Sequence, residues 1–269
     1  MIGSATKLVA IVGSPIAQVK SPSNFNGWFQ EHTVDLAMIP IDLRADSVAA
    51  FVNTLRGWQN LQGCVITVPY KQVITAHLDR LSQRAGLLGS VNVIRREADG
   101  TLLGDNVDGE GFVGAARQQG FEPKEKKALV LGAGGVGSAI ACALCEAGVA
   151  ELVITDLDNQ RVQALAKTLH SAFPNTRISH EYQSLADFDL VANASPAGMG
   201  DSGELPLSAA LLETLTAGTL VADVVTTPEV TAFLQRARML GAKIQTGPQM
   251  ARAQMGNLGH FMGVTPLGI

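Results

Sequence analysis

The segment that most constrains this chain is a glycine-rich run between an apolar strand and an apolar helix. The run reads LVLGAGGVGSA over residues 129–139, and Gly132, Gly134 and Gly137 match the pattern G-x-G-x-x-G. Such glycines allow a tight turn, close approach of a pyrophosphate to bare backbone, and close helix–strand packing. The N-terminus of the following helix also offers free N–H groups to phosphates. The sequence therefore predicts a dinucleotide-binding turn made of Gly132, Ala133, Gly134, Gly135, Val136 and Gly137.

An acidic residue supports this interpretation over a strand–turn–helix without a ligand. Asp156 ends the next predicted strand, 19 residues after Gly137. An acidic side chain at this spacing hydrogen-bonds the ribose hydroxyls of NAD. It would also repel the additional phosphate of NADP. Asp158 adds negative charge nearby, and Arg161 is the one basic residue that opposes it. We therefore expect NAD to be preferred over NADP.

Short apolar runs alternate with helical patterns along the whole chain, which favours parallel sheets covered on both faces. In the first part, strands are expected at 7–13, 36–43 and 61–68, with helices at 24–32 and 46–58, the latter capped by Asp46. The Asp99-Gly100 pair predicts the turn of an antiparallel hairpin. This part, residues 1–107, is expected to form a substrate-binding α/β domain with a mostly parallel sheet.

A second module is predicted from residue 108 onward. It begins with a helix and the strand–turn–helix of 126–148, and continues with strands in 151–158, 189–195, 219–225 and 242–247. This order is typical of a doubly wound, Rossmann-type domain. The sequence thus predicts an α/β chain of two domains. Residues 108–241 bind the nucleotide, and the C-terminal helical segment 242–269 completes the first domain.

Composition excludes several classes of function. The net charge of -4 argues against a nucleic-acid partner, which needs a basic footprint. No apolar run reaches the ~18 residues of a membrane span. The three cysteines are an odd number without framework spacing, which points to a reducing compartment. Cys142 and Cys145 are interpreted as small buried residues of an apolar helix. We expect a cytoplasmic protein with a small-molecule substrate and no metal, either a monomer or a homodimer.

Seven short motifs, taken in order, resemble those of the shikimate dehydrogenase family. They are GSPIAQVKSP, VITVPYK, GSVNV, GDNVDG, GAGGVG, NASPAGM and GPQMARAQ, and they span nearly the whole chain. The resemblance implies reversible hydride transfer between NAD(P) and the C3 hydroxyl or keto group of shikimate or a related cyclic hydroxy acid, a step of aromatic amino acid biosynthesis. The positions that match the family's catalytic residues are Lys71 and Asp108.

The implied chemistry agrees with these residue types. Oxidising a secondary alcohol requires a base near neutral pH, and a lysine can serve when burial and neighbouring charge lower its pKa. Asp108 would orient the ammonium group, and it would also cap the helix that follows. By the same resemblance, substrate contacts fall to Ser21, Thr67, Asn92 and Gln254, and further cofactor contacts to Asn193, Val224, Gly247 and Met250.

The chain departs from the family pattern at several polar positions. Val19 replaces the first serine of a pair, Gln18 a histidine, Val65 an asparagine, Val107 a threonine and Thr226 a tyrosine. In the family the serine pair and the tyrosine help to bind the substrate carboxylate. Each lost hydrogen bond to a charged group costs about 1.5–3 kcal/mol. We therefore expect a divergent member that uses shikimate poorly or prefers a related hydroxylated acid, unless Gln18 or Thr226 binds the carboxylate through water.

Three alternatives stay open at this point. A quinate-preferring dehydrogenase would keep the mechanism and change the substrate. A catalytically weak, nucleotide-responsive protein with a regulatory role would explain the altered pocket positions, although it would not need a base at Lys71. A folate-linked methylene dehydrogenase has a similar two-domain build, but GDNVDG and the motif of Gln254 fit it less well.

Overall fold

The chain forms two α/β units, described for residues 2–269 by a computed structural model. The first unit contains the chain up to Val107 together with Met255–Ile269, and the second contains Asp108–Gln254. The chain returns to the first unit between Gln254 and Met255, inside the last helix, α9 (Gly247–Met262). From the sequence, this return is predicted at residue 242. The α/β class is confirmed.

The first unit is built on a six-stranded sheet with the order β2-β1-β3-β5-β6-β4. β1 pairs in parallel with β2 and β3, whereas β5 pairs antiparallel with β3 and β6. The predicted hairpin is therefore confirmed, and Gly100 turns it with a φ of 89°. The strands are β1 (Lys7–Gly13), β2 (Leu36–Asp42), β3 (Leu61–Ile66), β4 (Arg80–Leu81), β5 (Val93–Arg96) and β6 (Leu102–Asp105).

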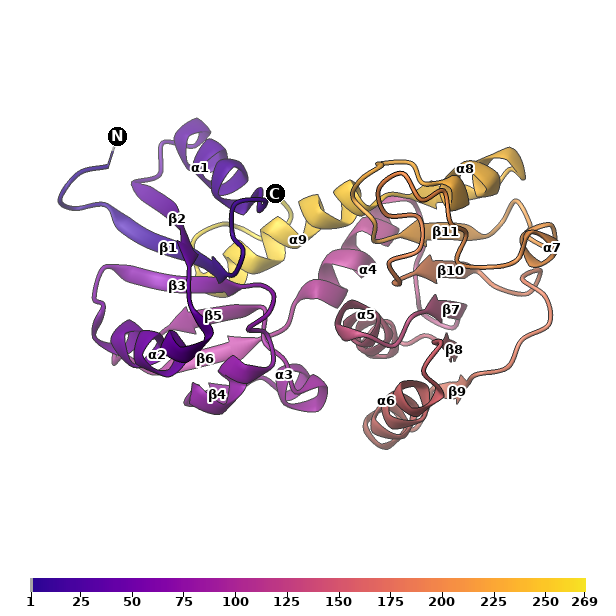
Figure 1. The fold of residues 1–269 in the computed structure, drawn as a ribbon, viewed down its shortest axis with the longest axis horizontal. Helices are drawn as coiled ribbons and strands as arrows, with labels where there is room; N and C mark the ends of the chain where they lie inside the picture. Colours follow the sequence, from indigo (N-terminus) through magenta and orange to yellow (C-terminus); the bar gives the residue numbers. More distant parts are fainter. Residues whose placement is uncertain (1) are drawn as a thin grey trace. The chain divides into compact units, whose positions relative to one another are not determined.

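Alternation along the strands divides the core of this unit into two layers. Val9, Ile11 and Val65 pack in one apolar cluster with Phe25 of α1 (Ser21–Glu31) and Leu258 of α9. The intervening residues Ala10, Cys64 and Ile66 pack in a second cluster with α2 (Val48–Gly57). Helices thus cover both faces of the sheet (Figure 1). The mixed apolar runs of the sequence reflect strands that are buried on both sides.

Two helix starts differ from the sequence-based expectation. α1 begins at Ser21, earlier than residue 24, because a proline in the first turn is compatible with a helix. α2 begins at Val48, after the 3-10 turn η1 (Ala45–Ser47). Asp46 does not cap it, because its carboxylate pairs with Arg44 at 2.8 Å. The short elements η2 (Val73–His77) and α3 (Gln83–Leu88) lie between β3 and β5 and were not predicted.

The second unit contains an all-parallel six-stranded sheet with the order β12-β11-β10-β7-β8-β9. This is the doubly wound order, in which ligands bind beyond the carboxyl ends of the two central strands. Those strands are β7 (Lys127–Leu131) and β10 (Leu190–Asn193). The others are β8 (Glu151–Thr155), β9 (Arg177–Ser179), β11 (Leu220–Asp223) and β12 (Lys243–Gln245), with helices α4 (Asp108–Gln118), α5 (Gly135–Glu146), α6 (Asn159–Ala172), α7 (Ala209–Leu212) and α8 (Ala232–Met239).

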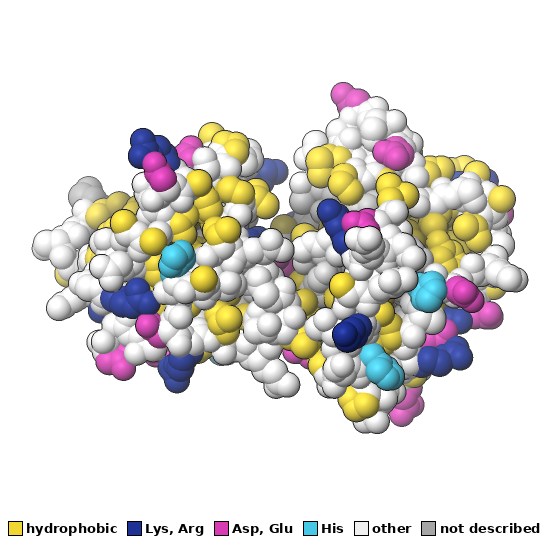
Figure 2. Space-filling view, turned by 60° about the horizontal axis from the view of Figure 1, so that its bottom comes forward, with side chains coloured by type: hydrophobic (Ala, Val, Ile, Leu, Met, Phe, Trp, Pro, Cys, Tyr) yellow, Lys and Arg dark blue, Asp and Glu magenta, His cyan; other side chains and the backbone are white. Residues whose placement is uncertain are grey.

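The three cysteines are buried and form no disulfide, as interpreted from the sequence. Burial raises the pKa of Cys64 and of Cys145 to about 12, so neither thiol ionises near neutral pH. Within residues 2–269, no helix combines the length and hydrophobicity that a membrane span requires. On the face drawn in Figure 2, basic and acidic side chains are interspersed, and neither sign forms a continuous patch.

Candidate active site

Lys71 lies in a turn that follows β3 and is fixed through its backbone. The Tyr70 amide donates to the Thr67 carbonyl at 3.0 Å, and the buried Tyr70 hydroxyl donates to the Leu43 carbonyl. The Lys71 carbonyl accepts from the Val91 amide at 2.7 Å. The turn therefore holds Lys71 beside the segment that carries the next predicted site residue.

That next residue is Asn92, which is fully buried. Its side-chain Oδ1 accepts from the Val107 amide at 2.9 Å, and its carbonyl accepts from the Ile66 amide at 2.7 Å. Asn92 thus joins the end of β3 to the residue immediately before Asp108. The predicted substrate contact also has a structural function, because its oxygen holds the backbone.

A buried ion pair supports the same segment and was not predicted. Arg84 of α3 donates to both oxygens of Asp105 at 3.0 and 2.9 Å. Ser82 Oγ and the Asn106 amide also donate to this carboxylate. Burial raises the pKa of Asp105, but the bonds from Arg84 and Ser82 outweigh it and hold this pKa below its usual range. An acidic residue that ends a buried strand was the signal that could have revealed this pair.

The structure brings three of the substituted positions into one apolar cluster. Val65 and Val107 are buried in it, and Val19 packs against it from the loop before α1. Ser21 is the first residue of α1 and is partly buried. Thr67 continues the face of β3 that carries Val65, since the two are separated by one residue.

In the second unit, Asp108 and Gln254 are brought together. Gln254 Nε2 donates to Asp108 Oδ1, and Asp108 is only 4% exposed. The helices α4 and α9 are close at this point, because a Cβ on Gly111 would lie 2.9 Å from Gln254 Cα. Asp108 is the first residue of α4 and not the capping residue before it. Its carboxylate is therefore held by a side chain of α9.

The glycine-rich turn has the geometry that its pattern predicts. Gly132 has a φ of 111°, and a Cβ on Gly137 would lie 1.9 Å from the Gly132 carbonyl oxygen. Gly134 precedes α5, and no side chain caps this helix. A Cβ on Gly134 or Gly135 would meet no atom within 4 Å, so the backbone is open to a ligand there. These residues fit a dinucleotide pyrophosphate.

Asp156 closes this turn from the end of β8. Its carboxylate accepts from the Ala133 amide at 2.7 Å and from the Asp158 amide at 2.8 Å. Burial alone would raise the pKa of Asp156. The two hydrogen bonds and the positive charge of Arg161 have a larger, opposite effect, so the pKa lies below its usual value. Arg161 itself pairs with Asp158 at 3.4 Å. Leu157, which the sequence reasoning overlooked, is fully exposed between the two acids.

Asn193 at the end of β10 shapes the adjacent loop. Its Nδ2 donates to the Ala197 carbonyl at 3.1 Å and to Asp223 Oδ1 at 3.0 Å, while its Oδ1 accepts from Ser195. A Cβ on Gly132 would lie 2.9 Å from the Ala194 carbonyl oxygen, so the loops after β7 and β10 are in contact. Asn193 therefore fixes the loop after β10, at the point in the sheet where the strand order reverses and where doubly wound domains bind their ligands.

Asp223 connects this wall to the segment after β11. The carboxylate is fully buried and accepts from Thr231 Oγ1 at 2.7 Å and from the Val225 amide at 3.0 Å. Burial raises its pKa despite these bonds. A Cβ on Gly247 would lie 2.7 Å from the Val224 carbonyl oxygen, so the start of α9 abuts this segment. Met250 is buried in α9, and Thr226 is exposed.

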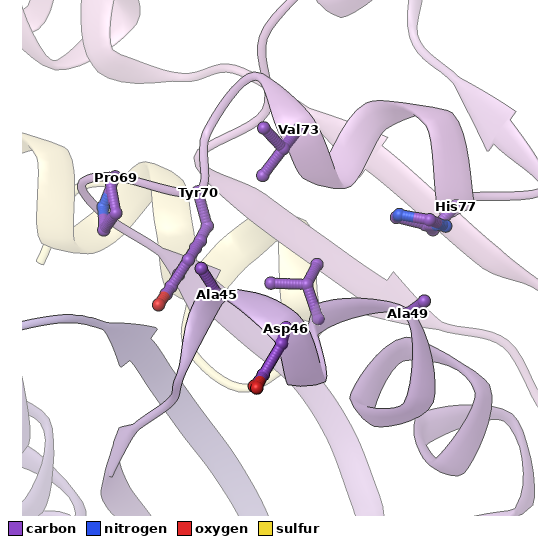
Figure 3. A pocket seen from close by; sticks show the side chains of 8 residues that line it. Ala45, Asp46, Ala49, Pro69, Tyr70, Val73 and His77 are labelled. Carbon is purple, nitrogen blue, oxygen red and sulfur yellow. The ribbon is translucent and has the colours of Figure 1, made fainter.

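A pocket of about 360 Å³ is lined by residues from both sides of Lys71 in the sequence (Figure 3). Pro69 and Tyr70 line it together with Val73, and Tyr70 reaches toward Ala45 at the start of η1. None of the predicted site residues lines this pocket. It is therefore separate from the candidate active site.

The doubly wound sheet and its glycine turn define a dinucleotide-binding protein with a second α/β unit. Residues 11–94 match the shikimate dehydrogenase substrate binding domain, and residues 115–199 match the shikimate / quinate 5-dehydrogenase family. The chain is 33% identical to a shikimate dehydrogenase (NADP(+)) of Lysinibacillus sphaericus over 90% of this chain and 86% of that one. The chain therefore belongs to the shikimate dehydrogenase family.

Two solved structures are similar over almost the whole chain. A ligand-free 5-ketofructose reductase of Gluconobacter has a TM-score of 0.92 and 28% identity, covering 98% of this chain and 95% of its own. A Listeria monocytogenes shikimate 5-dehydrogenase in complex with shikimate and NAD has a TM-score of 0.92 and 25% identity, covering 99% and 95%. This chain is a shikimate dehydrogenase-like oxidoreductase that uses NAD(P) and acts on a CH–OH group.

The buried Arg84–Asp105 pair gives a stability prediction. Arg84→Ala leaves a carboxylate that is 5% exposed without its cation, so we expect a loss of about 3–5 kcal/mol in the free energy of unfolding. Because the pKa of Asp105 is lower in the folded state than in the unfolded state, its charged form stabilises the fold at pH values above the unfolded-state pKa. The loss caused by Arg84→Ala should therefore shrink as pH falls through the folded-state pKa. Urea unfolding at several pH values measures both effects.

Arg44→Ala is the matched control, because its pair with Asp46 is also short but exposed. We expect a loss below about 1 kcal/mol. Equal losses for Arg44→Ala and Arg84→Ala would contradict the importance of the buried pair.

Asp223 should show the opposite dependence on pH. Because its pKa is raised, Asp223 takes up a proton at a higher pH in the folded state than in the unfolded state. Its contribution to the free energy of unfolding is therefore largest below the unfolded-state pKa and is lost as pH rises through the folded-state pKa. Asp223→Asn cannot titrate. The stability of the wild type relative to this variant should therefore decline from pH 4 toward pH 7, as measured by urea unfolding, and a constant difference would count against it.

Proposed function

We propose that this chain is an NAD-preferring dehydrogenase that oxidises a ring secondary hydroxyl, with Lys71 and Asp108 as the proton-handling pair. The observation that carries the proposal is the buried carboxylate of Asp108 at the start of α4. This carboxylate accepts a hydrogen bond from the Gln254 side chain of α9. The fixed backbone of Lys71 supports it from the first unit. Both residues match the family's catalytic positions.

Bound nicotinamide supplies the acceptor for the hydride. The Lys71 amine takes the hydroxyl proton as the hydride leaves, and in the reverse direction its ammonium donates that proton to the carbonyl oxygen. Asp108 orients the Lys71 amine and stabilises the ammonium form of Lys71 once the proton has been transferred. Gln254 keeps the Asp108 carboxylate in one orientation. Ser21, Thr67 and Asn92 bind the remaining hydroxyl groups of the substrate.

Shikimate and quinate are the first substrates to test, because both names occur in the matched family. A second candidate is 5-ketofructose, which is favoured by the similarity to the reductase of Gluconobacter over 98% of this chain. A purely regulatory protein would need neither an amine at Lys71 nor a held carboxylate at Asp108. A cytoplasmic location stays a prediction, supported by three cysteines that form no disulfide.

The NAD preference rests on the charge around the end of β8. Asp156 carries a negative charge beside the glycine turn, and its pKa is lowered. Leu157 presents an apolar, fully exposed side chain where a cation would be needed to hold a 2′-phosphate. Arg161 is paired with Asp158, so its charge is partly neutralised. The relative from Lysinibacillus is named for NADP(+), so the proposed NAD preference is a difference between the two proteins that can be measured.

Replacing Lys71 should remove the base without removing the nucleotide site. We expect Lys71→Ala to lower kcat by about 10²- to 10⁴-fold, the range of a general acid–base group, while the affinity for NAD changes little. Stopped-flow NADH formation and NAD titration measure the two quantities. Lys167→Ala on the exposed face of α6 is the control and should leave both unchanged. Full activity of Lys71→Ala would remove Lys71 from the mechanism.

The cofactor preference should reverse when the charge at β8 is changed. In Asp156→Asn/Leu157→Arg, repulsion of the 2′-phosphate is lost and a guanidinium is gained. A hydrogen bond to a charged group contributes about 1.5–3 kcal/mol. The ratio of kcat/KM for NADP over NAD should thus rise about 10- to 100-fold. Leu157→Met is the neutral control. An unchanged ratio would show that this segment does not select the cofactor.

A further inference from the structure

We propose that the preferred substrate is an uncharged polyhydroxylated alcohol or ketone, because valines replace hydrogen-bonding residues close in sequence to the proposed substrate contacts Ser21 and Thr67. The inference rests on the proposed function and names the substrate class of the same site. The reaction is unchanged: the hydride leaves the carbinol carbon for nicotinamide, and the hydroxyl proton goes to the Lys71 amine.

The first observation is that three of the substituted residues belong to one apolar cluster, and we call these three the valine wall. Val65 is 5% exposed and Val107 is 2% exposed, and both belong to the cluster against which Val19 packs. Methyl groups there cannot donate to a carboxylate, and a charge moved out of water next to them is destabilised. Because all three residues share one cluster, their effects act on the same part of a bound molecule.

The second observation is where this wall lies in the sheet. Val65 and Thr67 point to the same face of β3, and a Cβ on Gly13 at the end of β1 would lie 2.5 Å from Thr67 Cγ2. The apolar wall therefore continues directly into the position that carries the Thr67 hydroxyl. Hydroxyl groups both donate and accept, so Ser21 and Thr67 suit neutral hydroxyls of a substrate.

The third observation is that the arginines of the first unit are already engaged. Within the described part of this unit, each arginine contacts a carboxylate or a backbone carbonyl. The pairs are Arg44 with Asp46, Arg56 with Asp79, Arg80 and Arg95 with Glu97, Arg84 with Asp105, and Arg96 with the Leu55 and Arg56 carbonyls. A substrate carboxylate would thus find no uncommitted guanidinium among them.

The lysines do not change this conclusion. Lys7 and Lys20 are exposed, so an ion pair between either of them and a substrate carboxylate contributes at most about 1 kcal/mol. Lys71 is the proposed base, and a substrate carboxylate paired with it would take the place of the reacting hydroxyl. A charged substrate would therefore either face the valine wall or occupy the catalytic amine unproductively. An uncharged substrate meets neither obstacle.

The test compares substrates that differ only in charge. With the purified full-length chain and NAD, kcat/KM is measured for shikimate and its carboxamide, and for quinate and its carboxamide. We expect each carboxamide to exceed its acid by at least tenfold, mainly through a lower KM. A preference for the acids would overturn this inference and leave the proposed function intact. 5-Ketofructose is assayed in the reducing direction with NADH. Turnover of none of these compounds in either assay would reject both.

Variants assign the effect to the wall. Val19→Ser adds a hydroxyl at a partly exposed position, and Val107→Thr adds one with little change in shape. Each should raise the acid-to-carboxamide ratio of kcat/KM by about tenfold or more, as expected for a hydrogen bond to a charged group. Val9→Thr, in the same cluster but in the middle of β1, is the matched control and should leave the ratio unchanged.

Thermal unfolding of each variant separates a folding defect from a change in specificity. If Val107→Thr does not fold, Val19→Ser still decides the question, because its side chain is only partly buried. Equal ratios in the wild type, Val19→Ser and Val9→Thr would show that the wall does not select against carboxylates, and the inference would be wrong.

Discussion

Carboxylates at the ends of strands hold the loops of both units by accepting hydrogen bonds from the backbone. Asp105 ends β6 and accepts from the Asn106 amide, Asp156 follows β8 and accepts from the Ala133 amide, and Asp223 ends β11 and accepts from the Val225 amide. Parallel strands leave their last amides without ladder partners, and these side chains satisfy them. The residues around the glycine turn and before Asp108 depend on these bonds for their conformation.

The three carboxylates differ in how their charge is balanced, and this difference separates structural from functional roles. Asp105 has Arg84 as a bidentate partner, which is the geometry that best offsets burial. Asp223 has only neutral donors, so burial raises its pKa. Asp156 stays partly exposed beside an open turn and keeps a lowered pKa. Of the three, only Asp156 combines a partly exposed carboxylate with the open backbone of the glycine turn, as the proposed cofactor preference requires.

The sequence predicted the architecture because its strongest signals are local. The glycine spacing required a turn in which a Cβ on Gly137 would meet the Gly132 carbonyl, and the Asp99-Gly100 pair required a hairpin. Short elements such as α3 escaped prediction, since six residues are too few for a periodic pattern to emerge. Arg84 escaped for another reason: its partner, Asp105, lies 21 residues away, and no local pattern indicates such a pair. The hydrogen bond that Asn193 donates to Asp223, 30 residues away, also could not be predicted from a local pattern.

The same distinction explains why the family resemblance predicts the chemistry better than the substrate. Lys71, Asp108 and Gln254 are read directly from short motifs, and the structure holds Asp108 and Gln254 together. The proposed selection against a carboxylate depends instead on three valines from separate segments that meet in one cluster. No local pattern indicates that these three positions meet. Because they carry methyl groups, in a unit whose arginines are engaged elsewhere, the proposed discrimination between substrates is by charge.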